Sequence, residues 1–214
     1  MTIAAGFCTR DGIVLCADTM MTSAMRTYES KIFPYSIDGE SYAFALAGHE
    51  LYGKMAIDEC REAVASVAVE KRTVRTVRKA IAKAIKEIFE NHIDLRPESE
   101  RPDAQIYLLI AAWIPKDGGT HLFSTLSTAV TERLDCDCIG SGYYLGNFLI
   151  RPVFQNNMPM QEAILLATHA LSAAKTYDVN CGGASQFVIL RSDGSITNEI
   201  SPNTAMSEQF ILDL

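Results

Sequence analysis

The first eighteen residues predict a β-hairpin that fixes the start of the chain. Two apolar runs, Ile3 to Cys8 and Ile13 to Ala17, flank the Asp-Gly turn signal of Thr9 to Gly12. Because a hairpin folds back on itself, we expect the residue that ends it, Asp18, to lie close to Thr2.

Thr2 can carry a nucleophile and a base in one residue. It follows the initiator methionine, and Met1 before a residue as small as threonine is usually removed in the cell. Removal would leave a free α-amine beside the hydroxyl, and this amine, with a reference pKa of about 7.7 to 8.0, can accept the hydroxyl proton near neutral pH. The same residues also fit a chain that simply enters a strand after Met-Thr, so the pattern gains meaning only from its context.

The composition is that of one globular domain over residues 1–214. Hydrophobic residues make up 48% and charged residues 21% of the chain, which are globular proportions. The longest apolar stretches, such as Ile106 to Ile114, have the length of a strand, so we expect no membrane partner. The net charge of -7 argues against nucleic acid as a partner.

The cysteines and the start of the chain indicate a cytoplasmic protein. The start lacks the charged and long apolar regions of a secretory signal. The cysteines show no C-x-x-C spacing and are interpreted as reduced thiols. They are Cys8, Cys16, Cys60, Cys136, Cys138 and Cys181.

A basic run extends from Lys71 to Lys79. At helical spacing it is interpreted as the solvated face of a helix, with a docking surface as the alternative.

Periodicity predicts strands in blocks and helices in pairs, in an α+β protein. Helices are expected over Glu50 to Ala68, Thr73 to His92, Tyr143 to Ile150 and Met160 to Tyr177. After the hairpin, strands are expected over Ile32 to Tyr35, Ser41 to Leu46, Ala104 to Ile114, Thr120 to Leu126, Glu132 to Ile139, Ser185 to Leu190 and Ser195 to Ile200. Thr19 to Ser30 lacks a clear period and is expected to be a loop. This order predicts two sheets stacked face to face with a helix layer outside each.

Six short pieces of the chain occur together in the order of a known family. They are Thr2, Ala17 to Thr19, Lys31 to Phe33, Ala47-Gly48, Ile139 to Gly142 and the stretch from Asp178 to Gly183. The chain therefore resembles a proteasome β-type subunit, in the family that includes HslV-type peptidases within the N-terminal-nucleophile hydrolases. The resemblance implies a four-layer αββα sandwich of two antiparallel sheets.

The resemblance also implies a catalytic centre. Thr2 matches the nucleophilic threonine, Asp18 the buried aspartate and Lys31 the lysine paired with it. An ammonium beside the threonine hydroxyl would stabilise its alkoxide. Gly48 resembles the glycine whose backbone N–H faces the oxyanion. Taken alone, Lys31 also fits a surface strand end and Asp18 a turn cap.

The remaining site residues support the amine or contact the substrate. Ser141, Asp178 and Cys181 resemble the serine, aspartate and serine that hold the N-terminal amine, although Ser141 alone also fits a helix N-cap. Thr22 resembles the residue whose backbone pairs with an extended substrate. His49, after the glycine, adds polarity near the substrate pocket and also fits an ordinary helix start.

Two departures from the family pattern concern activity. A thiol at position 181 is a weaker hydrogen-bond partner than the family's hydroxyl, and the loop between Asp18 and Lys31 is shorter than in typical members.

The implied function is a threonine-type peptidase or amide hydrolase that needs no metal or organic cofactor. The implied partners are a peptide or unfolded protein substrate, further copies of the chain in a ring or other closed homo-oligomer, and an ATP-dependent unfoldase. A non-catalytic assembly subunit and a small-molecule amidase on the same fold are the alternatives.

Overall fold

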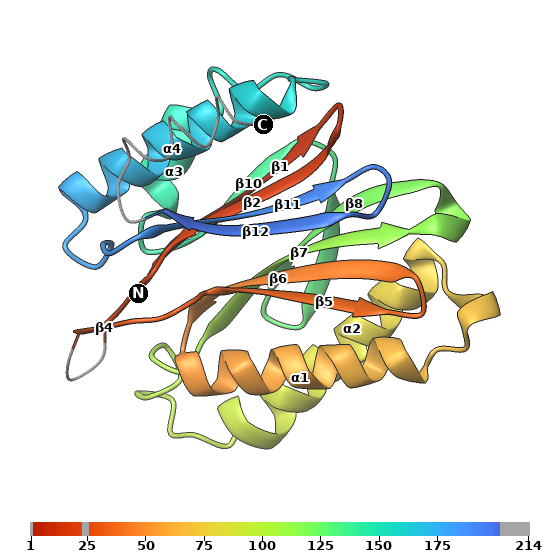
Figure 1. The fold of residues 1–214 in the computed structure, drawn as a ribbon. Coiled ribbons are helices and arrows are strands. Elements are labelled where there is room, and N and C mark those ends of the chain that lie inside the picture. The colour runs from red at the N-terminus through yellow and green to blue at the C-terminus, as the bar shows by residue number, and fades with distance from the viewer. Residues whose placement is uncertain (1, 23–25, 202–214) are drawn as a thin grey trace.

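Two five-stranded antiparallel sheets lie face to face, and a pair of helices covers the outer face of each (Figure 1). The structure is a computed structural model, which describes residues 2–22 and 26–201. The predicted four-layer αββα sandwich is confirmed. The predicted extent of the domain, 1–214, includes residues outside the described ones and stays a prediction.

The first sheet contains the N-terminal hairpin and has the strand order β10-β1-β2-β11-β12. Its strands are β1 (Ile3–Thr9), β2 (Gly12–Asp18), β10 (Cys136–Gly140), β11 (Ser185–Arg191) and β12 (Ile196–Ser201). The hairpin is confirmed, with Ala4 opposite Ala17 and Thr9 opposite Gly12. Gly12 has a φ of 144°, and a Cβ there would lie 2.1 Å from the Leu190 carbonyl oxygen, so this turn requires glycine.

The second sheet has the order β5-β6-β7-β8-β9. Its strands are β5 (Ile32–Ile37), β6 (Glu40–Gly48), β7 (Ile106–Ile114), β8 (Gly119–Leu126) and β9 (Ala129–Arg133). A 3-10 turn, η3 (Pro115–Asp117), joins β7 to β8.

The four predicted helices are confirmed in number and order along the described chain. They are α1 (Glu50–Ser66), α2 (Val74–Ile88), α3 (Tyr143–Ile150) and α4 (Met160–Tyr177). A 3-10 turn, η1 (Val69–Lys71), precedes α2, and a π-helical turn, η2 (Phe89–Ile93), continues it. Within the described residues, no helix is long and apolar enough to cross a membrane.

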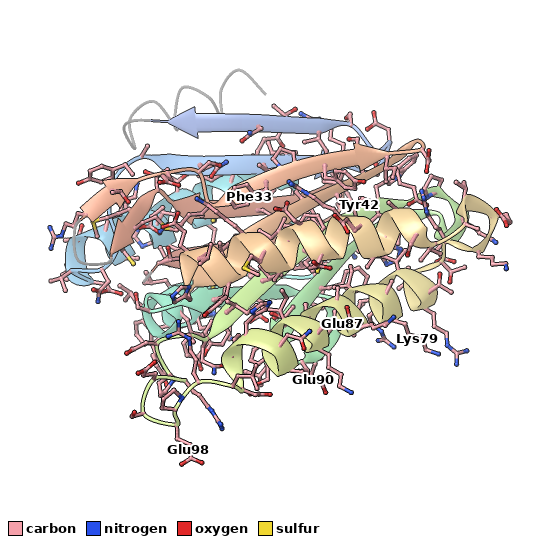
Figure 2. The ribbon with its side chains drawn as sticks, turned by 90° about the horizontal axis from the view of Figure 1, so that it is seen from below. Phe33, Tyr42, Lys79, Glu87, Glu90 and Glu98 are labelled. Atoms are coloured by element: carbon pink, nitrogen blue, oxygen red, sulfur yellow. The ribbon has the colours of Figure 1, made fainter. Side chains whose placement is uncertain are left out.

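The core is divided into three layers, which explains why the hairpin strands are apolar throughout. Ala4 and Ala17 face the second sheet, in the layer between the two sheets. Ala5 and Cys16 face the opposite way, toward α3 and α4. The third layer lies between the second sheet and helices α1 and α2. Tyr42 is buried in this layer, and the partly buried Phe33 packs against the layer (Figure 2).

One loop prediction and one strand prediction are wrong. The expected loop from Thr19 to Ser30 contains a short hairpin of β3 (Met20–Thr22) and β4 (Arg26–Tyr28). Each strand has only three residues, β3 with two buried methionines and β4 fully exposed, which is too short a run to show an alternating period. The single strand expected over Glu132 to Ile139 is two strands, β9 and β10, which belong to different sheets. The exposed Leu134 lies where the chain passes from one sheet to the other.

The interpretation of the basic run as solvated is wrong at one residue. Arg72 is 1% exposed, and its guanidinium pairs with Asp38 at 2.9 Å and with Glu40 at 3.5 Å. Its Nε also donates to the Val67 carbonyl at 2.8 Å. Arg72 therefore ties the connection between α1 and α2 to the β5–β6 turn. Further along α2, Lys79 points outward, as Figure 2 shows.

Candidate active site

Thr2 is buried at the start of β1, against the end of β10. Its carbonyl oxygen accepts hydrogen bonds from Gly142 N at 3.2 Å and Ser141 Oγ at 3.4 Å. Gly140 has a φ of 95°, and a Cβ there would lie 2.1 Å from the same oxygen. The backbone at Gly140 can therefore approach Thr2 closely only because it carries no side chain.

Lys31, Asp18 and Thr2 meet at one point, as predicted from the hairpin and the family resemblance. The side chains of Lys31 and Asp18 are fully buried, with Nζ 2.7 Å from Asp18 Oδ1. The same Nζ donates to Thr2 Oγ1 and, at 2.5 Å, to the Met20 carbonyl oxygen. Lys31 is thus not a surface residue, and Asp18 is not a turn cap.

Asp18 is held by the backbone as well as by Lys31. Its Oδ1 also accepts a hydrogen bond from Ile3 N at 3.1 Å, and its Oδ2 accepts one from Gly182 N at 2.9 Å. Burial lowers the pKa of Lys31, while the neighbouring Asp18 raises it, and burial is the larger effect. The ammonium beside Thr2 Oγ1 therefore holds its proton less tightly than an exposed lysine does.

Ser141, Asp178 and Cys181 form a second cluster beside Thr2. Asp178 Oδ2 accepts hydrogen bonds from Ser141 Oγ at 2.8 Å and from Cys181 Sγ at 3.5 Å. Burial raises the pKa of Asp178, but hydrogen bonds from Asn180, Ser141 and Cys181 outweigh burial and lower it. The N-cap of α3 is Gly142, so Ser141 is not the helix cap.

Cys181 acts here as a neutral thiol. Burial raises its pKa to about 12, and the nearby carboxylates of Asp18 and Asp178 add to the increase. At neutral pH the thiol keeps its proton and can donate to Asp178 as a serine hydroxyl would, only more weakly.

Gly48, His49 and Thr22 lie at the ends of strands or helices. Gly48 ends β6 with a φ of 99°, and a Cβ there would lie 2.2 Å from the Gln105 carbonyl oxygen, so the position requires glycine. His49 is the N-cap of α1, and its Nδ1 accepts a hydrogen bond from Tyr52 N at 3.5 Å, so it is a helix-start residue. Thr22 ends β3, opposite Arg26 of β4. The oxyanion and substrate roles of these residues stay predictions.

Gln186, near the start of β11, is a fully buried site residue that sequence reasoning missed. Its Oε1 accepts hydrogen bonds from Lys31 N at 2.9 Å and Ile32 N at 3.0 Å. Its Nε2 lies within hydrogen-bond distance of Ser30 Oγ at 2.8 Å, Ile32 O at 3.0 Å and Asn198 Oδ1 at 3.3 Å. The amide therefore fixes the backbone of Lys31 from the opposite sheet.

We expect Gln186→Leu to reduce both stability and activity. The substitution leaves the buried N–H groups of Lys31 and Ile32 without acceptors, which costs about 2 to 4 kcal/mol of unfolding free energy. Urea unfolding measures this loss. The matched control, Gln155→Leu at an exposed position, should change the free energy by less than about 0.5 kcal/mol. Equal effects of the two substitutions would contradict this role of the Gln186 amide.

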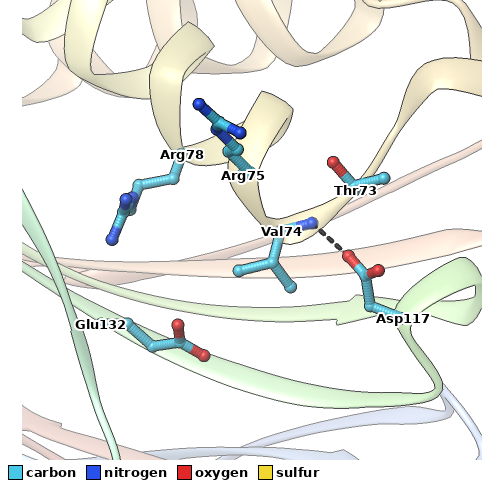
Figure 3. Close-up of a pocket in the computed structure, with 6 residues that line it drawn as sticks. All are labelled: Thr73, Val74, Arg75, Arg78, Asp117 and Glu132. Carbon is cyan, nitrogen blue, oxygen red and sulfur yellow. Dashed lines mark hydrogen bonds between the residues drawn. The ribbon is translucent and has the colours of Figure 1, made fainter.

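A surface hollow beside the start of α2 contains none of the predicted site residues (Figure 3). The Asp117 carboxylate accepts a hydrogen bond from Val74 N there. It thereby occupies the positive end of the helix, where an anion would otherwise bind. The hollow is lined by Thr73, Val74, Arg75, Arg78, Asp117 and Glu132.

The αββα sandwich of two antiparallel sheets is a proteasome-like fold of the N-terminal-nucleophile class, and Thr2, Asp18 and Lys31 meet in its interior. The chain belongs to the proteasome subunit family, whose sequence model matches residues 2–190. No match was found among curated proteins.

Solved structures with a similar fold include three of Anbu. The Anbu (Gly-1) mutant from Hyphomicrobium sp. strain MC1 is 14% identical, with a TM-score of 0.82 over 100% of this chain and 94% of that one. Anbu (ancestral beta-subunit) from Yersinia bercovieri is 12% identical, with a TM-score of 0.81 over 99% and 92%. A helical assembly of the Anbu complex from Pseudomonas aeruginosa is 12% identical, with a TM-score of 0.81 over 99% and 93%. At such identities the likeness concerns the fold alone.

Proposed function

We propose that this protein is a threonine-type peptidase or amide hydrolase that uses Thr2 as its nucleophile after removal of Met1. The observation that carries the proposal is the buried hydrogen bond between Lys31 Nζ and Thr2 Oγ1, with Asp18 as the counter-ion of the lysine. An ammonium in this position favours the alkoxide form of the hydroxyl, which is the nucleophile that attack on an amide needs.

In the first step, Thr2 Oγ1 attacks the carbonyl carbon while the free α-amine of the same residue takes the hydroxyl proton. The backbone N–H of Gly48 donates to the oxyanion. The C–N bond then breaks, the leaving amine receives the proton, and an ester on Thr2 remains. Attack by water on this ester releases the acid and regenerates the hydroxyl.

The second cluster would orient the α-amine. Ser141 Oγ already contacts the carbonyl oxygen of Thr2, and Asp178 accepts from both Ser141 and Cys181. A base acts efficiently only when its lone pair is aimed at the proton that it removes, so this support belongs to catalysis as well as to folding.

The substrate would be an extended peptide. On one edge β3 pairs with β4, and on the other edge Met20 N donates to the Gly182 carbonyl oxygen at 3.0 Å, while no strand of the described chain pairs with Thr22 there. The backbone of Thr22 on its other edge can therefore pair with a peptide strand. His49, next to Gly48, would lie beside the substrate side chain.

We further propose that the protein works as a closed homo-oligomer in the cytoplasm, with an ATP-dependent unfoldase as a possible supplier of unfolded chains. The fold shared with Anbu, which forms a helical assembly in one of the similar structures, supports the oligomer. Six free cysteine thiols fit a reducing compartment.

Hydrolysis assays test this function. The protein, prepared with Thr2 as its first residue, should cleave fluorogenic peptides. The product amine should appear in an initial burst, as expected when an ester intermediate accumulates. Cleavage of small amides without peptides would indicate the amidase alternative. No hydrolysis of either class would indicate a non-catalytic subunit.

Cys181→Ser should increase activity. A hydroxyl donates to Asp178 more strongly than a thiol, so kcat should rise by about two- to fivefold through better orientation of the amine. The control, Cys60→Ser, changes a buried thiol in the opposite helix layer and should leave kcat unchanged. A fall in kcat for Cys181→Ser, with the fold intact, would contradict the proposed role of position 181.

A further inference from the structure

A second lysine approaches Asp18 from another layer of the molecule. Lys31 reaches the carboxylate from the position just before β5 of the second sheet, whereas Lys175 comes from the last turn of α4, which packs on the outer face of β2. Lys175 is half-buried, and its Nζ donates to Ser185 Oγ at 2.7 Å.

The strand register places this contact beside the catalytic cluster. Ser185 is the first residue of β11, is 1% exposed, and lies directly opposite Asp18 of β2. Residues directly opposite each other in an antiparallel pair point to the same face, with Cβ atoms about 4.5 to 5.5 Å apart. The hydroxyl that Lys175 Nζ contacts therefore belongs to the cross-strand neighbour of Asp18, on the same face of the sheet.

The charges around Lys175 show the same proximity. Burial lowers its pKa, Asp18, Cys16 and Cys181 raise it, and Lys31 lowers it further. The groups that face Lys31 in turn are Asp18, Cys181 and Thr2. The fully buried carboxylate of Asp18 is thus ion-paired with Lys31 and also attracts Lys175 at longer range, with the thiols of Cys16 and Cys181 nearby.

A lysine in the last turn of a helix commonly stabilises the helix dipole at the surface. Lys175 differs because its ammonium is turned toward the sheet and hydrogen-bonded to a buried serine. A lysine that only stabilises the helix dipole needs neither this direction nor a buried hydrogen-bond partner.

We propose that Lys175 is a positioning residue of the nucleophilic centre, which acts on Asp18 and Lys31 through its charge and through Ser185. This inference rests on the proposed function and deepens it. The ammonium of Lys175 is held near the Lys31–Asp18 ion pair by Ser185, and its positive charge weakens the hold of Lys31 on its own proton. Lys31 is then bound less strongly by Asp18 and can stabilise the alkoxide of Thr2.

The coupling can be measured without turnover. In protein labelled with ¹³C at the lysine ε-carbons, the Lys31 resonance is assigned by its loss in Lys31→Arg, and its shift is followed against pH. Removal of a nearby positive charge favours the protonated form, so Lys175→Met should raise the pKa of Lys31 by about 0.5 to 1 unit. Lys175→Arg keeps the charge and should restore the wild-type midpoint. The control Lys83→Met, at an exposed site on α2, should leave the midpoint unchanged.

The pH dependence of kcat/KM gives the second readout. The α-amine of Thr2 must be neutral to act as a base, so its pKa sets the acidic limb of the profile. Loss of the Lys175 charge should raise this pKa, and the acidic limb should move to higher pH in Lys175→Met and return in Lys175→Arg. If Lys175→Met does not fold, Lys175→Gln, which keeps a polar partner for Ser185, gives the same test. An unmoved Lys31 midpoint in a folded, charge-neutral variant would overturn the inference. Absence of hydrolysis by the wild-type protein would instead overturn the proposed function, and the midpoint would still decide the coupling.

Discussion

Thr2→Ala is expected to abolish hydrolysis and leave the fold intact. The variant lacks the hydroxyl that Lys31 Nζ contacts, and the other two groups at this ammonium are a carboxylate, of Asp18, and a backbone carbonyl, of Met20. Loss of a nucleophile lowers kcat by at least about a thousandfold in enzymes that form a covalent intermediate. Initial rates on a fluorogenic peptide, together with thermal unfolding, measure the two properties.

The control for this prediction is Thr2→Ser, which keeps the hydroxyl and the amine and removes only a methyl group. It should retain measurable activity. A Thr2→Ala protein with the activity of the wild type would end the threonine mechanism.

Lys31→Met should remove activity and also destabilise the protein. The substitution leaves the carboxylate of Asp18 fully buried without its counter-ion, and loss of one partner from a buried ion pair costs about 3 to 5 kcal/mol of unfolding free energy. It also removes the ammonium beside Thr2, so kcat should fall with the stability. Denaturant unfolding and peptide hydrolysis measure the two effects.

The double variant Asp18→Asn/Lys31→Met separates catalysis from folding. It leaves neither member of the Lys31–Asp18 pair as a lone charge, so it should recover part of the lost stability, because replacement of both ion-pair partners is often close to neutral. Recovery should be incomplete, because asparagine has one acceptor oxygen for the two backbone N–H groups that Asp18 accepts. Its activity should stay absent. Recovery of activity together with stability would show that Lys31 has only a structural role.

The strongest sequence patterns predicted the parts of the fold that position the site. The Asp-Gly turn between two apolar runs fixed the register of the hairpin, and that register alone brings Asp18 to Thr2. The amphipathic period of α2 likewise predicted both a helix and its buried face, since its apolar positions form one core-facing stripe.

The missed elements share a physical cause, because their structure depends on partners distant in sequence. The β3–β4 hairpin has only three residues in each strand, which is too few to show a strand period, and its backbone pairing is visible only in the structure. Arg72 lies in a basic run and is indistinguishable in sequence from its solvated neighbours, although it is buried and pairs with the exposed Asp38 and the buried Glu40.

The missed site residues had a fainter signal. Gln186 directly precedes the apolar run Phe187 to Leu190, and a polar side chain buried next to such a run must find hydrogen-bond partners. Lys175 ends an apolar helix, where a lysine at the helix end is ordinary. The register of β11 against β2 places Ser185, the hydrogen-bond partner of Lys175, opposite Asp18, and the sequence does not reveal this register.

The most direct test of the account is the intact mass of the purified native protein before and after reaction with a threonine-directed epoxyketone or β-lactone. The account predicts a mass that lacks Met1 and then gains a single probe adduct, which peptide mapping places on Thr2. A protein that retains Met1 and forms no adduct would contradict the proposed nucleophile and favour the non-catalytic subunit.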